Sequence, residues 1–422
     1  MSSVEYYLFL NIRSSSEGAV MTTGSLTPST QPDISDLELL RRIRRVLHRW
    51  PELGHEEHRT SAFLENVLGQ LGLTITRPAP TSLAVTVGPA GRPVIAVRAD
   101  LDAISQTEET GLPFASERPG IMHACGHDGH TAALVVLARR LMHRPPAVTA
   151  LLIFQQAEEV HPCGARRVIA GLGTGLWPAD KVYGFHLWPE LPERTIGLKT
   201  GPLMPGISGV DVTFHAVRGR SHGTRVGLGA TDALQAVFRF CLAANKVIPP
   251  GRRPTKERPV VLHFGIAQTG QAPNQPAVNG LVRATMRWLD HDSRDRCVKG
   301  LQRIADDIAA ETAVDIMITI DHDVRPVVTN SRTANSMIAQ ACEQAALDVV
   351  AEYPQEPLGV SDDFGCYLDQ APGALFFVGC GTGDHPHELH DSKFDFREEA
   401  LLPAVNVLEL LVRQAPSRAG RR

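Results

Sequence analysis

Carboxylates, imidazoles and a thiol occur where several predicted strands end. Thiolates and imidazoles are common Zn²⁺ ligands, and carboxylates also suit Mn²⁺. Open α/β sheets bind ligands beyond the carboxyl ends of their strands, so these side chains are expected to meet at one edge of the sheet. The pattern predicts a site for one such ion or for a pair. The candidate residues are Asp100, Asp102, Cys125, His127, Glu158, Glu159, His186 and His390.

Taken singly, each of these residues has a simpler explanation. A lone histidine such as His186 is usually a hydrogen-bonded structural residue. A cysteine among Ala and Gly, such as Cys125, is usually a small buried apolar residue. A pair of glutamates usually lies on a solvated face, but Glu158 and Glu159 directly follow an apolar segment. Metal-binding side chains at several strand ends at once favour the metal site.

The adjacent glutamates indicate what the metal site does. Consecutive side chains of an extended segment point in different directions, so Glu158 and Glu159 can serve different purposes. One carboxylate can complete the metal site while its neighbour takes a proton from water and returns it to a leaving amine. This division predicts metal-assisted hydrolysis.

Apolar periodicity predicts an α/β domain with a largely parallel sheet. Helical spacing over 36–73 predicts two amphipathic helices that are broken at Pro51. Strands then alternate with helices, and this order is typical of parallel sheets. Strands are predicted at 82–88, 92–102, 147–159, 179–188 and 373–379, and helices after His130 and at 164–171, 333–347 and 398–414.

A second domain is inserted into the first. Residues 209–321 follow the order strand, helix, strand, strand, helix, strand, which is that of a ferredoxin-like α+β unit. The catalytic domain is therefore expected at 34–206 and 321–422, and the insertion at 207–320. Residues 1–33 are rich in Ser, Thr, Gly and Pro and are predicted to be a mobile leader, which leaves Met21 as an alternative start.

Composition limits the possible partners. The 422 residues include 42 Lys and Arg against 46 Asp and Glu, so the basic excess of a nucleic-acid-binding protein is absent. A small-molecule substrate is expected instead. No apolar run approaches the ~20 residues of a membrane span, and the segment 6–12 lacks the features of a signal peptide. A cytoplasmic location is expected, and the seven scattered cysteines are expected to be reduced.

Six motifs together resemble one known family. The segments RADLDAI, MHACGHDGHTAAL, QQAEE, GFHLWP, LKTGPLM and LHDSKFDF occur in the order found in M20 metallopeptidases. Over residues 36 to 412 the chain resembles the amidohydrolase branch that contains hippurate hydrolases, N-acyl-amino-acid deacylases and plant auxin-conjugate hydrolases.

The resemblance implies a role for each candidate residue. Glu158 matches the general base, and Asp102 matches an acid that orients a metal-binding neighbour. Asp100 occupies a position that is a ligating histidine in other branches, while Asp128 and His130 are expected to support ligands or cap the helix. Two divalent ions bridged by the Cys125 thiolate are implied, and Zn, Mn, Co and Ni all remain open. The implied metal ligands are Cys125, His127, Glu159, His186 and His390.

The insertion resembles the lid domain of the family, which commonly also forms a dimer interface. His222 matches a lid histidine that stabilises the oxyanion of the tetrahedral intermediate. Asn274 and Arg287 match positions that hold the substrate carboxylate, although Arg287 could instead be an exposed strand arginine.

The chain departs from the family pattern at several positions, which leaves the substrate open. Thr224, Arg225 and Val226 replace the usual Met-Pro-His segment after Gly223. The other departures are Asp362 for Glu, Ser392 for Pro, and the additional residues His385 and His387 in the loop that contains His390.

The predicted function is hydrolysis of the amide of an N-acyl amino acid or a similar small conjugate. A dipeptidase is one alternative, but it needs a site for a free α-amino group that the sequence does not reveal. A catalytically silent binding protein is another. The presence of Glu158 argues against it, because metal binding alone needs only Glu159.

Overall fold

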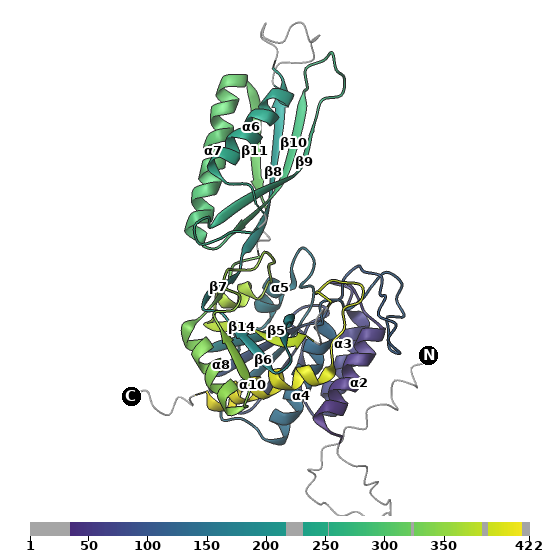
Figure 1. The fold of residues 1–422 in the computed structure, drawn as a ribbon. Helices are drawn as coiled ribbons and strands as arrows, with labels where there is room; N and C mark the ends of the chain where they lie inside the picture. Colours follow the sequence, from purple (N-terminus) through teal and green to yellow (C-terminus); the bar gives the residue numbers. More distant parts are fainter. Residues whose placement is uncertain (1–33, 217–230, 252, 322–324, 382–386, 416–422) are drawn as a thin grey trace, which may run out of the picture. The chain divides into compact units, whose positions relative to one another are not determined.

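The chain divides into two compact units. The computed structural model describes residues 34–216, 231–251, 253–321, 325–381 and 387–415, so the predicted leader lies outside the described residues. Unit 1 comprises Met1–Lys199, Asn330–Tyr353 and Tyr367–Arg422, and unit 2 comprises Thr200–Thr329 and Pro354–Cys366 (Figure 1). Unit 2 thus includes a segment that the sequence pattern assigned to the catalytic domain, and the predicted domain limits stay a proposal.

Unit 1 is built on a mixed, mostly parallel sheet of eight strands in the order β1-β2-β4-β3-β5-β14-β6-β13. Pairs β3·β4, β3·β5, β5·β14 and β6·β13 are parallel, whereas β1·β2, β2·β4 and β6·β14 are antiparallel. The predicted α/β class is therefore confirmed. The strands are β1 (Ile75–Thr76), β2 (Leu83–Val87), β3 (Val94–Asp100), β4 (Thr149–Gln155), β5 (Lys181–Pro192), β6 (Thr195–Leu198), β13 (Asp348–Ala351) and β14 (Gly373–Gly381).

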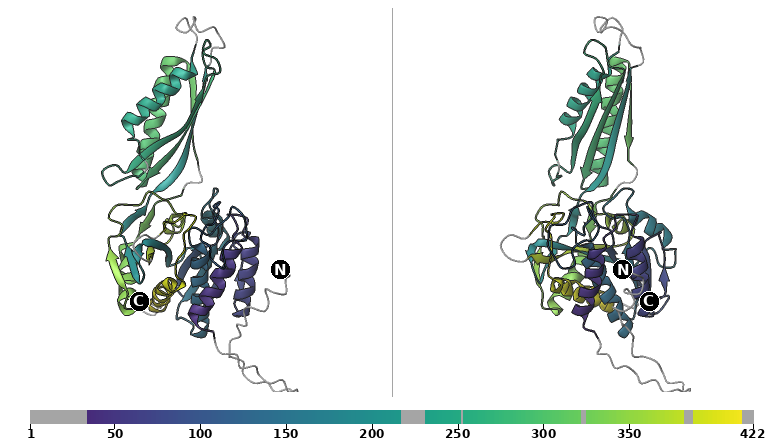
Figure 2. Two further views of the ribbon diagram at one scale, coloured as in Figure 1. Left: turned by 45° about the vertical axis from the view of Figure 1, so that its right-hand side comes forward. Right: turned by 90° about the vertical axis from the view of Figure 1, so that its right-hand side faces the viewer.

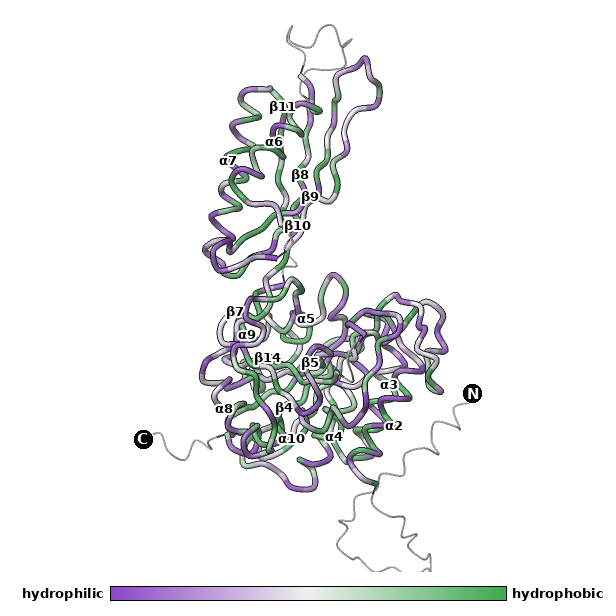
Figure 3. Tube along the Cα trace, in the orientation of Figure 1, coloured by the Kyte–Doolittle hydropathy of each residue, from purple (hydrophilic) through white to green (hydrophobic). Residues whose placement is uncertain are grey.

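Most helices of unit 1 bury one apolar face against this sheet or against one another, whereas α4 is buried almost throughout. Figure 3 shows alternating hydrophilic and hydrophobic residues along α2, as expected for a helix with one buried face. Its first turn is capped by Ser35, whose hydroxyl accepts a hydrogen bond from the Glu38 amide. The helices are α2 (Asp36–Arg49), α3 (His58–Gln70), α4 (His127–His143), α5 (Gly164–Gly171), α8 (Arg332–Gln344) and α10 (Leu401–Gln414), with the short α9 (Gly365–Leu368) at the sequence boundary of the units.

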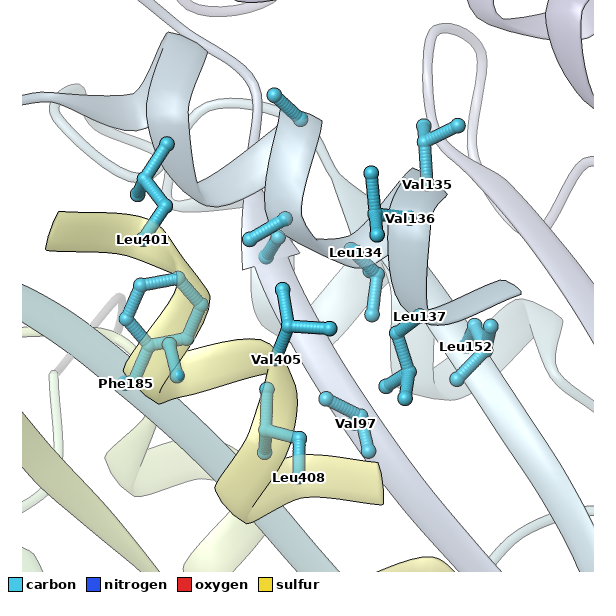
Figure 4. Close-up of a cluster of buried hydrophobic side chains, with 14 of the residues drawn as sticks. Val97, Leu134, Val135, Val136, Leu137, Leu152, Phe185, Leu401, Val405 and Leu408 are labelled. Atoms are coloured by element: carbon cyan, nitrogen blue, oxygen red, sulfur yellow. The ribbon is translucent and has the colours of Figure 1, made fainter. Parts of the chain in front are cut away.

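Helix α4 lies at the centre of the core of unit 1. Strands β3, β4 and β5 are buried almost throughout, and they contribute Val97, Leu152 and Phe185 to a cluster with α4 and α10 (Figure 4). Leu137 of α4 and Leu408 of α10 are fully buried in the same cluster. Each such side chain stabilises the fold by roughly 1.5–3 kcal/mol relative to an exposed one. The core therefore holds the first residue of α4, His127, at a fixed place beside the sheet.

Buried charges connect α2 to the start of α4. The Arg44 guanidinium and the His48 ring both donate to the fully buried carboxylate of Asp128, at 3.2 and 2.8 Å. His48 also contacts Glu108, at 3.2 Å. Burial opposes the charged form of His48, but the bonds to Asp128 and Glu108 outweigh it and raise the His48 pKa to about 9. A buried, charged cluster thus fixes Asp128, the residue that follows His127.

Unit 2 contains the expected ferredoxin-like arrangement. Its four-stranded antiparallel sheet has the order β11-β8-β10-β9, and the chain order strand, helix, strand, strand, helix, strand is confirmed. Figure 2 shows both helices on one face of this sheet. A separate pair joins β7 (Gly201–Met204) and β12 (Val328–Asn330). The other elements are β8 (Gly206–Ala216), α6 (Ala233–Val247), β9 (Val260–Thr269), β10 (Asn279–Trp288), α7 (His291–Thr312) and β11 (Val314–Ile320).

Within the described part of the chain, every helix is too short or too polar to cross a bilayer.

Candidate metal centre

The candidate ligands of unit 1 gather beyond the carboxyl ends of neighbouring strands. Strand β3 ends at Asp100, and Glu158 and Glu159 follow the end of β4 by three and four residues. His186 was expected to close its strand, which was wrong, because β5 continues to Pro192. The reason is that β5 pairs with β3 only as far as Gly184 and then runs on beside β14. His186 nevertheless lies just beyond Gly184, the last residue of β5 that pairs with β3.

All five predicted ligands fall into two groups that share Cys125. The ligand atoms of Cys125, His127 and His186 lie within 4.8 Å of one another, as do those of Cys125, Glu159 and His390. A thiolate can bridge two ions, so a residue common to two groups has the geometry of a bridging ligand. The first group is buried and the second reaches the surface at His390, and together they are consistent with a dinuclear metal site.

The two buried imidazoles of the first group are fixed in matching orientations. The Nδ1–H of His127 donates to the Asp102 carbonyl at 2.9 Å, and that of His186 donates to the Leu187 carbonyl at 2.8 Å. Each carbonyl fixes the tautomer and leaves Nε2 with a lone pair. The Nε2 atom of His186 lies 3.4 Å from the Cys125 Sγ. Both rings therefore present the nitrogen that a metal ion needs.

A left-handed glycine separates Cys125 from His127. Gly126 has φ 82°, and a Cβ atom built there would lie 3.1 Å from Leu187. Glycine adopts this conformation without steric cost, which lets the chain turn abruptly into α4. The turn allows both neighbours of Gly126 to face the same site.

The electrostatics of the first group favour a bound cation. Burial raises the pKa of the Cys125 thiol well above its usual value, so the thiolate needs a compensating positive charge. Burial lowers the pKa of His186 to about 3, which keeps its ring neutral as a ligand must be. Burial also disfavours the charged form of His127, but Asp100 and Cys125 outweigh it and raise the His127 pKa. The donor set thus fits a divalent ion, which would take the place of the proton that the charged His127 ring carries.

His130 and Asp100 form another buried group with His127, but their atoms are already used. His130 donates from Nδ1 to Asp100 Oδ1 at 2.7 Å, and its Nε2 accepts the Leu187 amide at 3.1 Å. Asp100 Oδ2 accepts from the Arg98 guanidinium at 2.6 Å. With both ring nitrogens and both carboxylate oxygens occupied, these residues are suited to supporting the site rather than to binding the ion.

Two residues in or beside the second group, which comprises Cys125, Glu159 and His390, have a left-handed backbone. Ala157, which precedes the glutamate pair, has φ 54°, and His390 has φ 68°. Such conformations are unfavourable for residues with a side chain and persist only where the surroundings impose them. His390 Nε2 lies 3.1 Å from Glu159 Oε1, and the His390 amide donates to the Ala124 carbonyl at 2.8 Å. That bond ties the His390 loop to the segment that contains Cys125.

Ser392 holds the same loop from the other side. Its hydroxyl donates to Glu109 Oε2 at 2.8 Å, and its carbonyl accepts the Glu109 amide, also at 2.8 Å. This is one of the positions at which the chain departs from the motif, since Pro is usual there. A side-chain hydrogen bond that proline lacks thus restrains the loop, while the additional residue His385 lies outside the described residues.

The predicted residues of unit 2 are not brought together. His222 lies outside the described residues. Asn274 is in the loop that joins β9 to β10, whereas Arg287 is at the far end of β10, where it pairs with Ile207 and Val261. The eight steps from Asn279 to Arg287 span about 27 Å at the usual rise per residue. Asn274 and Arg287 are therefore attached to different parts of the β9–β10 hairpin, and their substrate roles stay a prediction.

One buried acid near the site was missed in the sequence. Glu57, at the start of α3, accepts the Ala157 amide at 2.7 Å. In the segment GHEEH it resembles an ordinary polar helix start, and 100 residues separate it from Ala157. Only tertiary structure reveals this contact.

Comparisons with known proteins agree with this geometry. The model of a family described as peptidase family M20/M25/M40 matches residues 96–414. An N-acetyl-L-cysteine deacetylase of Bacillus subtilis (strain 168) is 32% identical over 368 residues, covering 86% of this chain and 84% of that protein. An N-acetyldiaminopimelate deacetylase of Lacticaseibacillus casei (strain BL23) is 32% identical over 374 residues, covering 87% of this chain and 95% of that protein.

Solved structures are similar over most of the chain. The Bacillus subtilis YXEP protein, described as a dinuclear metal binding peptidase from the M20 family, superposes with a TM-score of 0.75 at 29% identity, covering 89% of this chain and 98% of that one. A putative aminohydrolase from methicillin-resistant Staphylococcus aureus gives a TM-score of 0.82 at 26% identity, covering 90% of this chain and 96% of that one. A dinuclear site in a relative is consistent with the two groups around Cys125.

Replacing the shared thiol tests the arrangement. Cys125→Ala should weaken metal binding by more than about 100-fold, beyond the scale for a lost supporting hydrogen bond. The measurement is metal content per chain after dialysis against a chelator. Cys342→Ala is the matched control, because Cys342 is another buried thiol, on the buried face of α8. Equal metal content in the two variants would return Cys125 to the role of a core residue.

Proposed function

Because the chain belongs to peptidase family M20/M25/M40, we propose that it is a metal-dependent amidohydrolase acting on N-acyl amino acids or similar small amide conjugates. The observation that carries the proposal is the position of Glu158. Its carboxylate lies within 4.8 Å of the ligand atoms of His127 and Glu159 and is 5% exposed. A buried carboxylate directly beside a metal-binding set is suited to proton transfer.

The metal ions are proposed to be held by Cys125, His127 and His186 on one side and by Cys125, Glu159 and His390 on the other. When bound, divalent ions supply Lewis-acid polarisation of the amide carbonyl and lower the pKa of water. The structure leaves Zn, Mn, Co and Ni equally open, since the donor set is mixed.

Glu158 acts as the general base and then as the general acid. Its carboxylate accepts a proton from the attacking water, and the neutral acid returns that proton to the nitrogen of the departing amine. Asp102 positions two of the proposed ligands, because its backbone carbonyl orients the His127 ring and its carboxylate Oδ2 accepts the Glu159 amide at 2.8 Å. His222 is proposed to stabilise the oxyanion, as its motif position implies.

The substrate class follows from the relatives and from unit 2. The two similar deacetylases act on acetylated amino acids, according to their names. Arg287 of β10 is proposed to bind the carboxylate of such a substrate, and Asn274 is proposed to bind substrate as well. A dipeptidase stays the second candidate, although no described residue has been identified as a partner for a free α-amino group.

Unit 2 is also proposed to form a homodimer through α6 and β9. Leu234, Phe238 and Leu242 recur every four residues along α6, and the last two are 60% and 65% exposed. Strand β9 is the edge of its sheet and carries the exposed Ile266. Exposed apolar stripes and open strand edges are typical of interfaces. An antiparallel β9 pair satisfies twofold symmetry, so a second copy fits this surface.

The first prediction concerns the base. Glu158→Gln should keep its metal but lose at least about 100-fold in kcat, the usual scale for a lost general base. Glu159→Gln should lose metal as well, because this variant removes a proposed ligand. Metal content and steady-state turnover of N-acetyl and N-benzoyl amino acids separate the two. Near-normal turnover by a fully metallated Glu158→Gln variant would refute the assignment.

The second prediction concerns substrate binding. Arg287→Ala should raise KM for an N-acyl amino acid with little change in kcat, because an ion pair to a non-reacting group stabilises ground and transition states alike. The corresponding N-acyl amino acid amide, which has no carboxylate, should be unaffected. If both substrates are weakened equally, Arg287 is structural.

The third prediction concerns assembly. Phe238→Glu should convert the dimer to a monomer in sedimentation velocity, since a charge at the centre of an apolar interface is costly to desolvate. Val350→Glu is the control, because Val350 is a 40% exposed apolar residue of β13 in unit 1. An unchanged sedimentation coefficient for Phe238→Glu would rule out this interface.

A further inference from the structure

We infer that Glu57 is a positioning residue that fixes the backbone corner at Ala157, from which Glu158 and Glu159 project. The inference rests on the proposed function, which makes those two glutamates the base and a metal ligand. Among the described residues, Glu57 belongs to none of the groups that could hold an ion. Its action is therefore on the backbone that precedes the pair.

The Glu57 carboxylate is fully buried and directed at Ala157. Its Oε1 accepts the Ala157 amide at 2.7 Å, and its Oε2 accepts the Thr81 hydroxyl at 2.7 Å. The Ala157 carbonyl accepts the Gly164 amide at 2.8 Å. Both polar groups of Ala157 are thus fixed, and this residue is the one with a left-handed backbone at φ 54°.

A second carboxylate, that of Asp102, binds the backbone on the other side of Glu158. Asp102 Oδ2 accepts the Glu159 amide at 2.8 Å. The amides on either side of Glu158 are therefore bound by two buried acids from different parts of the chain, Glu57 at α3 and Asp102 after β3. Amides that are bound in this way fix the direction in which the side chain between them leaves the backbone.

This arrangement is unfavourable for the carboxylates themselves. Burial and the charge of Asp102 both raise the pKa of the Glu57 carboxyl. A negative charge close to a buried carboxyl opposes its ionisation. Stability alone would favour an uncharged residue there, whereas a carboxylate holds a backbone amide with a strong, charge-assisted bond.

Glu52, in the segment that precedes α3, provides a matched comparison. Its carboxylate accepts the amides of Arg59 and Thr60, in the first turn of α3, at 3.1 and 2.8 Å, and it is 9% exposed. Glu52 therefore stabilises α3 without touching the corner. A loss that comes only from weakening α3 must appear in Glu52→Ala as well.

The experiment compares Glu57→Met, Glu57→Gln and Glu52→Ala in the full chain. Glu57→Met fills the same space but frees the Ala157 amide. Glu57→Gln retains a carbonyl for that amide and an NH₂ group for the Thr81 oxygen. The readouts are kcat and KM, metal content, and hydrogen exchange of residues 155–160 in metal-free protein.

Glu57→Met should lower kcat by roughly 10- to 100-fold with KM nearly unchanged, the scale for a lost supporting bond. Exchange at 155–160 should accelerate at least tenfold, while Glu57→Gln and Glu52→Ala stay near the wild-type values. Should Glu57→Met fail to fold, Thr81→Val tests the same point by removing the hydroxyl that orients Glu57, and it should shift kcat and exchange in the same direction.

Wild-type kcat and exchange in Glu57→Met would overturn the inference, as would equal losses in Glu57→Gln or Glu52→Ala. The proposed function fails separately, if the metallated wild-type protein hydrolyses no N-acyl amino acid. In that event the exchange comparison still decides whether Glu57 fixes the corner.

Discussion

The hydrogen bond from an imidazole Nδ1–H to a backbone carbonyl is the interaction on which the candidate centre depends. His127 and His186 each make it, to the carbonyls of Asp102 and Leu187. Because the acceptor belongs to the backbone, the tautomer of each ring is set by the fold and not by the ion. The Nε2 atoms are then directed at the centre before any metal arrives, beside a thiol whose ionisation requires a cation.

The positions of these carbonyls depend on interactions farther from the centre. His130 accepts the Leu187 amide and is itself held by Asp100, so the residue whose carbonyl orients His186 is also held through its amide. Asp128 is held by Arg44 and His48 from α2, which fixes the turn that follows Cys125. The fully buried polar residues near the centre thus form a continuous set of supports that links four distant segments of the chain.

Much of the fold could be predicted because it depends on local apolar periodicity. The order of elements in both units follows from this periodicity. The meeting of Glu159 with Cys125 and His127 follows because open α/β sheets bind ligands at the edge where their strands end. The length of β5 could not be predicted, because its second half is paired by β14, almost 200 residues later. The Glu57 contact and the separation of Asn274 from Arg287 likewise depend on tertiary packing and on strand register, which a single sequence does not contain.

X-ray absorption spectroscopy of the zinc-loaded protein tests the central claim most directly, namely that Cys125 joins two ions in one centre. The account predicts a zinc–sulfur shell at about 2.3 Å with mixed nitrogen and oxygen ligands, and a metal–metal distance of about 3.5–4 Å at two ions per chain. A spectrum with only nitrogen and oxygen neighbours and no second metal would contradict it.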